Sequence, residues 1–145
     1  MKHLTPALAI AALAAGAYLW FTPASAPVKT ASETQTNATT ALVEITLPAS
    51  LSTTATLGKT AFNAKCASCH AENAVGQDGV APPLVHKIYE PSHHGDESFQ
   101  RAAKLGVRAH HWRFGDMPPV NGVTRGDVKM IVAYIRELQA ANGIH

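Results

Sequence analysis

The sequence predicts an all-α fold, in which one small helical domain follows a hydrophobic N-terminal segment and a flexible linker. Composition divides the 145 residues into three parts: an apolar stretch at 1–21, a stretch rich in Thr, Ala and Ser at 22–56, and a mixed, globular part at 57–145. The globular part has apolar residues at helical spacings and little of the alternation that marks a strand. The formal net charge is only +2 and the basic residues are scattered, so nucleic-acid binding is not indicated.

Residues 1–21 are typical of a segment that targets a chain to a membrane. Met1-Lys2-His3 is a short positive start, and the next 18 residues, Leu4 to Phe21, carry no charge. A helix of that length spans about 27 Å, just enough to cross a bilayer. Three aromatic residues at its outer end suit the membrane interface: Tyr18, Trp20 and Phe21.

The fate of this segment has two readings. Ala24-Ser25-Ala26 resembles the small-residue site at which a signal peptide is removed. Pro27 would follow the cut directly, where proline is poorly tolerated, so we favour an uncleaved anchor over a cleaved signal peptide. Either outcome exports the chain. We therefore expect the protein to be anchored on the periplasmic side of the inner membrane, or to be soluble in the periplasm if the leader is cleaved.

Residues 22–56 have few charges and no helical stripe, which favours a flexible tether. A coil of about 35 residues has a root-mean-square span of about 30 Å. Within it, residues 42–47 alternate partly like a strand. Whether they pack along the domain as an N-terminal extension stays open.

The most specific motif is Cys66-Ala67-Ser68-Cys69-His70. The pattern C-x-x-C-H is the attachment signature of c-type haem: each thiol forms a thioether with a vinyl group, and the imidazole reaches the iron. The chain has two cysteines, and both lie here. A haem would also add apolar surface to the core of a short domain.

Three other readings of the motif are weaker. A zinc site needs four ligands, and the chain has no second cysteine pair. A thioredoxin-like pair should open a helix after a strand, whereas here a helical pattern runs into the pair. A disulfide between Cys66 and Cys69 would close a very short loop and restrain little.

Three longer helices are expected. The first covers residues 57–66, with Thr56 as its N-cap, and Gly58 within it indicates close packing against another backbone. The second covers residues 96–105, capped by Asp96 and ended by Gly106. The third follows a capping box of Thr124 and Asp127 and ends near Gly143. Its apolar stripe consists of Val128, Ile131, Val132, Ile135 and Leu138.

Residues 57–145 resemble class I cytochrome c. The resemblance rests on the C-x-x-C-H motif, on Ala81-Pro82-Pro83-Leu84, and on Gly115-Asp116-Met117-Pro118-Pro119. It implies that the first and last helices cross near right angles through Gly58, Phe62 and Tyr134. It also implies that the backbone carbonyl of Pro82 holds the His70 ring and that Leu84 lines the haem pocket.

The resemblance assigns the second axial position to Met117. Met1 lies in the leader and Met130 in the last helix, whereas Met117 lies in a loop stiffened by prolines. A thioether ligand favours Fe(II) and raises the reduction potential. The alternative is a methionine that packs in the core.

Other side chains leave several roles open. Five histidines lie between the motif and the last expected helix: His86, His93, His94, His110 and His111. One of them could replace Met117 on the iron, or the pairs His93-His94 and His110-His111 could bind copper or zinc. All five could instead be exposed loop residues. Three more residues could pair with haem propionates or simply pack: Tyr89, Trp112 and Arg113.

A haem with both axial positions filled has no open site, so we expect a single-electron carrier and not an enzyme. Its partners would be a respiratory donor and a terminal oxidase or reductase. Residues 57–145 carry ten Lys and Arg against eight Asp and Glu, so strong electrostatic steering is not evident. The alternatives are a redox subunit of a larger oxidoreductase, a haem sensor, and a copper-handling protein.

Overall fold

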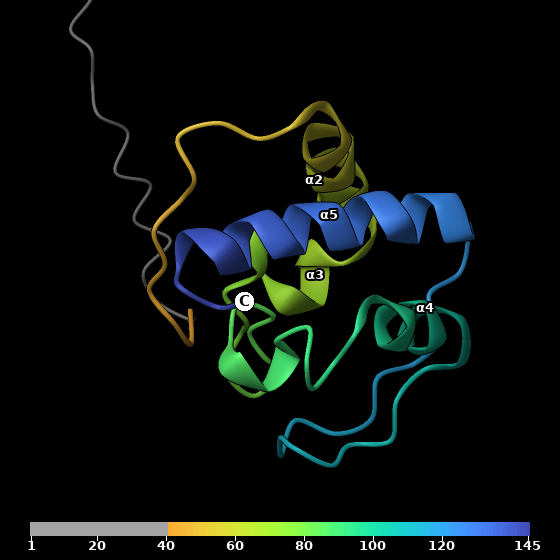
Figure 1. The fold of residues 1–145 in the computed structure, drawn as a ribbon. Coiled ribbons are helices and arrows are strands. Elements are labelled where there is room, and N and C mark those ends of the chain that lie inside the picture. Colours follow the sequence, from red (N-terminus) through yellow and green to blue (C-terminus); the bar gives the residue numbers. More distant parts are fainter. Residues whose placement is uncertain (1–40) are drawn as a thin grey trace, which may run out of the picture. The chain divides into compact units, whose positions relative to one another are not determined.

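Six helical segments make up the part of the chain that the computed structural model describes, residues 41–145 (Figure 1). The longer ones are α2 (Thr53–Lys65), α4 (Asp96–Leu105) and α5 (Arg125–Ala141), and the short ones are α3 (Ala67–His70), η1 (Glu72–Ala74) and η2 (Lys87–Tyr89). Within residues 41–145 the extended pairing consists of two isolated bridges, Gln77 with Ala81 and Val107 with Met117. The all-α prediction is therefore confirmed.

The predicted leader at residues 1–21 and most of the predicted linker, residues 22–40, lie outside the described residues. Whether the leader anchors the chain or is removed is therefore not addressed by the structure. Between residues 41 and 145, every helix is too short or too polar to cross a membrane.

The last part of the predicted linker, residues 41–56, packs against the domain, which is the alternative that the sequence left open for residues 42–47. Leu42 N–H donates to the Val75 carbonyl at 3.2 Å. Thr46 pairs with the Asn142 amide through two hydrogen bonds, of 2.8 and 2.9 Å. Two apolar side chains of this extension also contact the core: Ile45 and Leu51. The alternation in this stretch thus marks a segment that lies along the domain, without becoming a strand.

Helix α2 begins earlier than predicted, at Thr53, and its N-cap is Ser52 instead of Thr56. The Ser52 hydroxyl accepts a hydrogen bond from Ala55 N–H at 3.1 Å. The same hydroxyl donates to the Glu137 carboxylate at 2.6 Å, and Ser52 N–H donates to it at 3.1 Å. The start of α2 is therefore fixed both by the local cap from Ser52 and by a carboxylate on α5 that binds the same residue.

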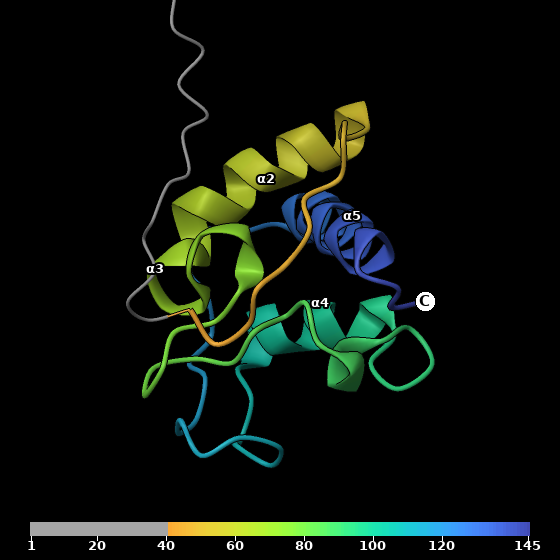
Figure 2. The ribbon, with the colours of Figure 1, turned by 90° about the vertical axis from the view of Figure 1, so that its left-hand side faces the viewer.

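Helices α2 and α5 cross steeply at the centre of the domain. Helix α5 is seen along its length in Figure 1 and nearly end-on in Figure 2, whereas α2 is seen nearly end-on in Figure 1 and along its length in Figure 2. At the crossing, a Cβ placed on Gly58 would lie 1.9 Å from the Met130 carbonyl oxygen. Beside it, the Phe62 and Tyr134 rings meet edge to face, with centroids 5.7 Å apart. Gly58 is thus the close backbone contact that its place in the sequence indicated.

The two C-terminal helices largely follow their sequence signals. Thr124 and Asp127 form the predicted capping box at the start of α5. Helix α4 spans the predicted residues, but its N-cap is Gly95, not Asp96. The Asp96 carboxylate is instead paired with Arg136 Nε of α5 at 3.0 Å, so it ties two helices together. All five residues of the predicted apolar stripe of α5 are buried: Val128, Ile131, Val132, Ile135 and Leu138. Tyr134 and Gln139 of the same helix are buried with them.

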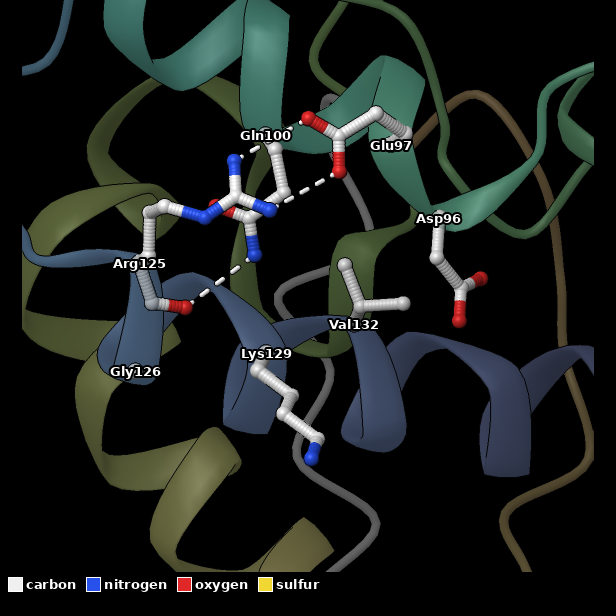
Figure 3. A pocket seen from close by; sticks show the side chains of 7 residues that line it. All are labelled: Asp96, Glu97, Gln100, Arg125, Gly126, Lys129 and Val132. Carbon is white, nitrogen blue, oxygen red and sulfur yellow. Dashed lines mark hydrogen bonds and ion pairs between the residues drawn. The ribbon is translucent and has the colours of Figure 1, made fainter.

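A hollow of about 400 Å³ separates α4 from the first turns of α5 (Figure 3). Across it the Arg125 guanidinium makes two hydrogen bonds to the Glu97 carboxylate, at 3.0 and 2.9 Å. Gln100 donates to the Arg125 carbonyl at 3.1 Å. These polar groups are thus hydrogen-bonded to one another. Because the Arg125–Glu97 ion pair is exposed to solvent, it connects the two helices but adds little to the stability of the domain.

Candidate functional site

A second cavity, of about 620 Å³, has the size and the apolar walls of a cofactor site. It brings together the C-x-x-C-H motif, the segment after it, the core face of α5, and the loop that joins α4 to α5. The apolar lining comes largely from Phe62, Leu84, Phe99, Val107, Val128, Ile131 and Ile135. The cavity therefore collects residues that are far apart in the sequence around one space.

The two cysteines lie at the junction of α2 and α3. Cys66 caps the end of α2 through its N–H, which donates to the Phe62 carbonyl at 2.7 Å, and its own carbonyl accepts from His70 N–H at 2.9 Å. Cys66 is half-buried, Cys69 is exposed, and both line the cavity as free thiols. The helical turn thus presents both sulfur atoms and the His70 ring to one space.

Burial raises the pKa of the Cys66 thiol to about 11, and the nearby Cys69 adds to the shift. Thiol-disulfide enzymes require the opposite, a thiol whose pKa is lowered so that the thiolate attacks. The environment of Cys66 therefore lacks the lowered thiol pKa that is typical of thiol-disulfide enzymes.

His70 is buried, and its Nδ1–H donates to the Pro82 carbonyl at 2.9 Å. Burial lowers the pKa of the ring, and the bond to Pro82 opposes this. The ring is therefore held neutral in one orientation, which leaves Nε2 with a free lone pair beside the cavity. A hydrogen bond of this kind fixes the tautomer of a metal-ligating histidine.

A tight turn after the motif positions the Pro82 carbonyl. Ala71, Asn73 and Ala74 all have φ near +59°, which is strained for residues with a side chain. The turn is held because Asn73 Oδ1 accepts from the Tyr134 hydroxyl at 3.0 Å. The Ala74 carbonyl also accepts from Leu84 N–H at 2.8 Å. Contacts to α5 and to the Ala81–Leu84 segment thus fix the carbonyl opposite His70.

Met117 lies on the loop between α4 and α5, half-buried in the wall of the cavity. Two backbone hydrogen bonds of 2.9 Å pair it with Val107. Gly106 is required beside this pair, because its φ is +76° and a Cβ there would lie 2.5 Å from the Met117 carbonyl oxygen. The structure therefore places the imidazole of His70 and the thioether of Met117 around one cavity, whereas Met130 contributes to the α2–α5 crossing.

Trp112 supplies an unusual feature of the cavity wall. Its Nε1 is buried and has no hydrogen-bond partner, although the Tyr89 hydroxyl lies near. Burial raises the pKa of Tyr89, and the neighbouring Trp112 opposes this. The Tyr89 hydroxyl is thus the polar neighbour of this indole N–H, which is also open to pairing with a polar group of a ligand. Arg113, the third residue considered for this role, is exposed.

The histidine pairs, which lie apart in the sequence, come together in the fold. His93 and His94 contact His111, and His110 stacks beside them. The pKa of His111 is lowered from its ordinary value by desolvation and then by the charges of the other three rings. His86 stands apart from this group: it packs on Trp112, and its Nδ1 accepts from Ile88 N–H at 3.2 Å. Sequence spacing alone could not show that the two pairs meet.

The donor set fits a haem. Two thiols can form thioethers, a neutral imidazole and a thioether can ligate iron, the walls suit a macrocycle, and an unpaired indole N–H suits a propionate. The chain was then compared with known proteins. The model of the family Cytochrome c matches residues 55–139, which contain the whole of this donor set. No match was found among curated proteins or solved structures.

Proposed function

The chain belongs to the cytochrome c family, whose members bind haem c covalently and carry electrons, and we propose that it is a single-electron carrier with His70 and Met117 as axial ligands. The observation that supports this most directly is the cavity. It is lined by the two motif cysteines, by His70 and by Met117.

Cys66 and Cys69 would hold the haem through two thioether bonds. Both sulfur atoms lie on the one turn that also carries His70, so attachment and ligation are fixed by the same short helix. The Pro82 carbonyl, at 2.9 Å from Nδ1, keeps Nε2 of His70 turned to the iron. Leu84, buried in the same wall, excludes water from this face.

Met117 would complete the coordination from the opposite loop. The pairing with Val107 and the prolines that follow limit the movement of this loop. A haem held by His70 and Met117 on its two faces would supply one-electron exchange between Fe(III) and Fe(II), and these two residues would leave no position open for a substrate. A soft sulfur ligand stabilises Fe(II) and raises the potential.

The proposal extends to location and partners. The apolar residues 1–21 would place the domain on the periplasmic side of the inner membrane, anchored or released by cleavage. The carrier would accept electrons from a respiratory donor and deliver them to a terminal oxidase or reductase. The linker that the sequence predicts after this segment would keep the domain close to such membrane partners at high effective concentration.

Replacement of Met117 tests the ligation. Met117→Ala should keep the haem attached but abolish the weak red absorption band that ferric haem shows when methionine is bound. Met130→Leu is the matched control, because Met130 lies in α5 outside the cavity lining, and it should keep the band. If the band survives in Met117→Ala, another methionine is the ligand and the assignment of Met117 is wrong. If the band is absent from the unchanged protein, the assignment is also wrong, and a histidine of the 93–111 region becomes the candidate.

A further inference from the structure

Four histidines form a cluster that the proposed ligation of the haem by His70 and Met117 does not use. His93 and His94 lie on the loop before α4, and His110 and His111 lie on the loop after it. One ring nitrogen each from His93, His94 and His111 lies within 4.8 Å of the other two. Two ligand nitrogens on one ion, each at about 2.0–2.1 Å, are at most about 4.2 Å apart, so small side-chain rotations would bring all three to one ion.

The rings are close enough for this without backbone movement. Ring centroids are 4.7 Å apart for His93 and His94, 5.3 Å for His94 and His111, and 5.4 Å for His93 and His111. His93 and His111 are exposed and His94 is half-buried. A metal ion can therefore reach the cluster from solvent, and the outer rings are free to turn toward it.

Hydrogen bonds orient part of the cluster in advance. Nδ1–H of His94 donates to the Ile88 carbonyl at 2.6 Å, which leaves Nε2 as the ligand atom. Nδ1–H of His110 donates in the same way to the Arg108 carbonyl at 2.8 Å. The His94 backbone is itself fixed, since its carbonyl accepts from Arg136 of α5 at 2.6 Å. Such second contacts are typical of histidines that bind metals.

We propose that His93, His94 and His111 bind one imidazole-preferring transition-metal ion, and Cu(II) more tightly than Zn(II). Imidazole nitrogen suits copper and zinc, and copper stands highest in the order of divalent affinities. The cluster contains no carboxylate, so calcium and magnesium are not favoured. Three protein ligands leave a position open for water, for His110 or for exchange with a partner.

The site lies at the rim of the haem cavity, because His94, His110 and His111 also line that cavity. The same rings are thus candidates for two roles, a separate metal site and a ligand of the haem iron. The two roles give different signals. A separate site binds metal while the haem spectrum keeps its methionine band, whereas a histidine on the iron removes that band.

The test uses the full haem-containing chain without an affinity tag. All proteins carry His3→Ala, because a histidine third from a free amino terminus can bind copper by itself. Copper(II) sulfate and zinc(II) sulfate are titrated separately by equilibrium dialysis, with metal counted by mass spectrometry and copper examined by electron paramagnetic resonance. His93→Ala and His111→Ala remove one ligand each, and His145→Ala, an exposed histidine outside the cluster, is the control.

We expect one copper per chain with several nitrogen ligands, and weaker binding of zinc. Each cluster variant should lower the copper affinity by about tenfold or more, while His145→Ala leaves it unchanged. An unaltered visible spectrum in each variant shows that the haem domain is folded. Binding that is absent, not stoichiometric, or retained when His93 and His111 are both replaced would overturn the proposal. Such a result would not affect the proposed electron-carrier function, because that function is tested separately by the visible spectrum of the haem.

Discussion

Gly58→Ala should loosen the crossing on which the haem domain is built. The added Cβ would lie 1.9 Å from the Met130 carbonyl oxygen and 2.5 Å from its carbon, whereas real Cβ atoms keep at least 3.0 Å. The contacts are backbone atoms of α5, so no side chain can turn away. Helices α2 and α5 must therefore separate by about 1 Å, and the edge-to-face contact of Phe62 with Tyr134 is lost in part.

The size of the effect follows from overpacking. An extra methyl group in a tight core costs about 1–3 kcal/mol, and a rigid backbone contact places this change at the upper end. For a domain of this size, 3 kcal/mol lowers the melting temperature by roughly 10 °C or more. Since Cys66 directly follows α2 and caps its end, the displacement should weaken the methionine band of the haem before the domain unfolds.

Guanidinium and thermal unfolding of the haem-containing protein, followed by circular dichroism, measure this cost. Gly126→Ala is the matched control, because it makes the same change in a helix of the same domain, where the nearest atom to the new Cβ is 3.5 Å away. It should be neutral or slightly stabilising. If Gly58→Ala melts within about 2 °C of Gly126→Ala, the two helices do not cross as closely as described.

The remaining predictions concern attachment and pH. Cys66→Ala or Cys69→Ala should each retain haem through one thioether, and the double variant should yield a chain whose mass lacks haem; equal haem content in all three would contradict the attachment. Hydrogen bonds from Thr124, first from its backbone N–H and then from its hydroxyl, lower the pKa of Asp127. The resulting stabilisation is present above the ordinary value of 3.8 and is lost as the pH falls through the lowered pKa. In urea titrations Asp127→Asn should therefore be less stable than the unchanged protein at neutral pH and should approach it in acid; a gap that does not narrow refutes the capping box.

Features set by neighbouring residues were predictable from the sequence. The capping box of Thr124 and Asp127 depends on residues three apart, and the apolar stripe of α5 follows one helix face. The C-x-x-C-H motif is likewise local, since its chemistry requires both thiols and the imidazole on one turn. The same holds for Gly106, which ends α4 where predicted.

Features set by distant contacts were not predictable. The choice of Ser52 over Thr56 as the cap of α2 is supported by Glu137, which lies 85 residues from Ser52. Whether residues 42–47 pack along the domain stayed open in the sequence, because the hydrogen bonds of this segment go to remote partners such as Asn142. The meeting of the two histidine pairs depends on how the loops on either side of α4 fold back, and spacing carries no such information.

The most direct test of the account combines intact mass with visible spectra of the purified protein in both redox states. The account predicts a mass equal to the polypeptide plus one haem, a low-spin spectrum when reduced, and a methionine band when oxidised. A colourless product from cells with working haem attachment, or a high-spin iron that binds carbon monoxide at once, would contradict it.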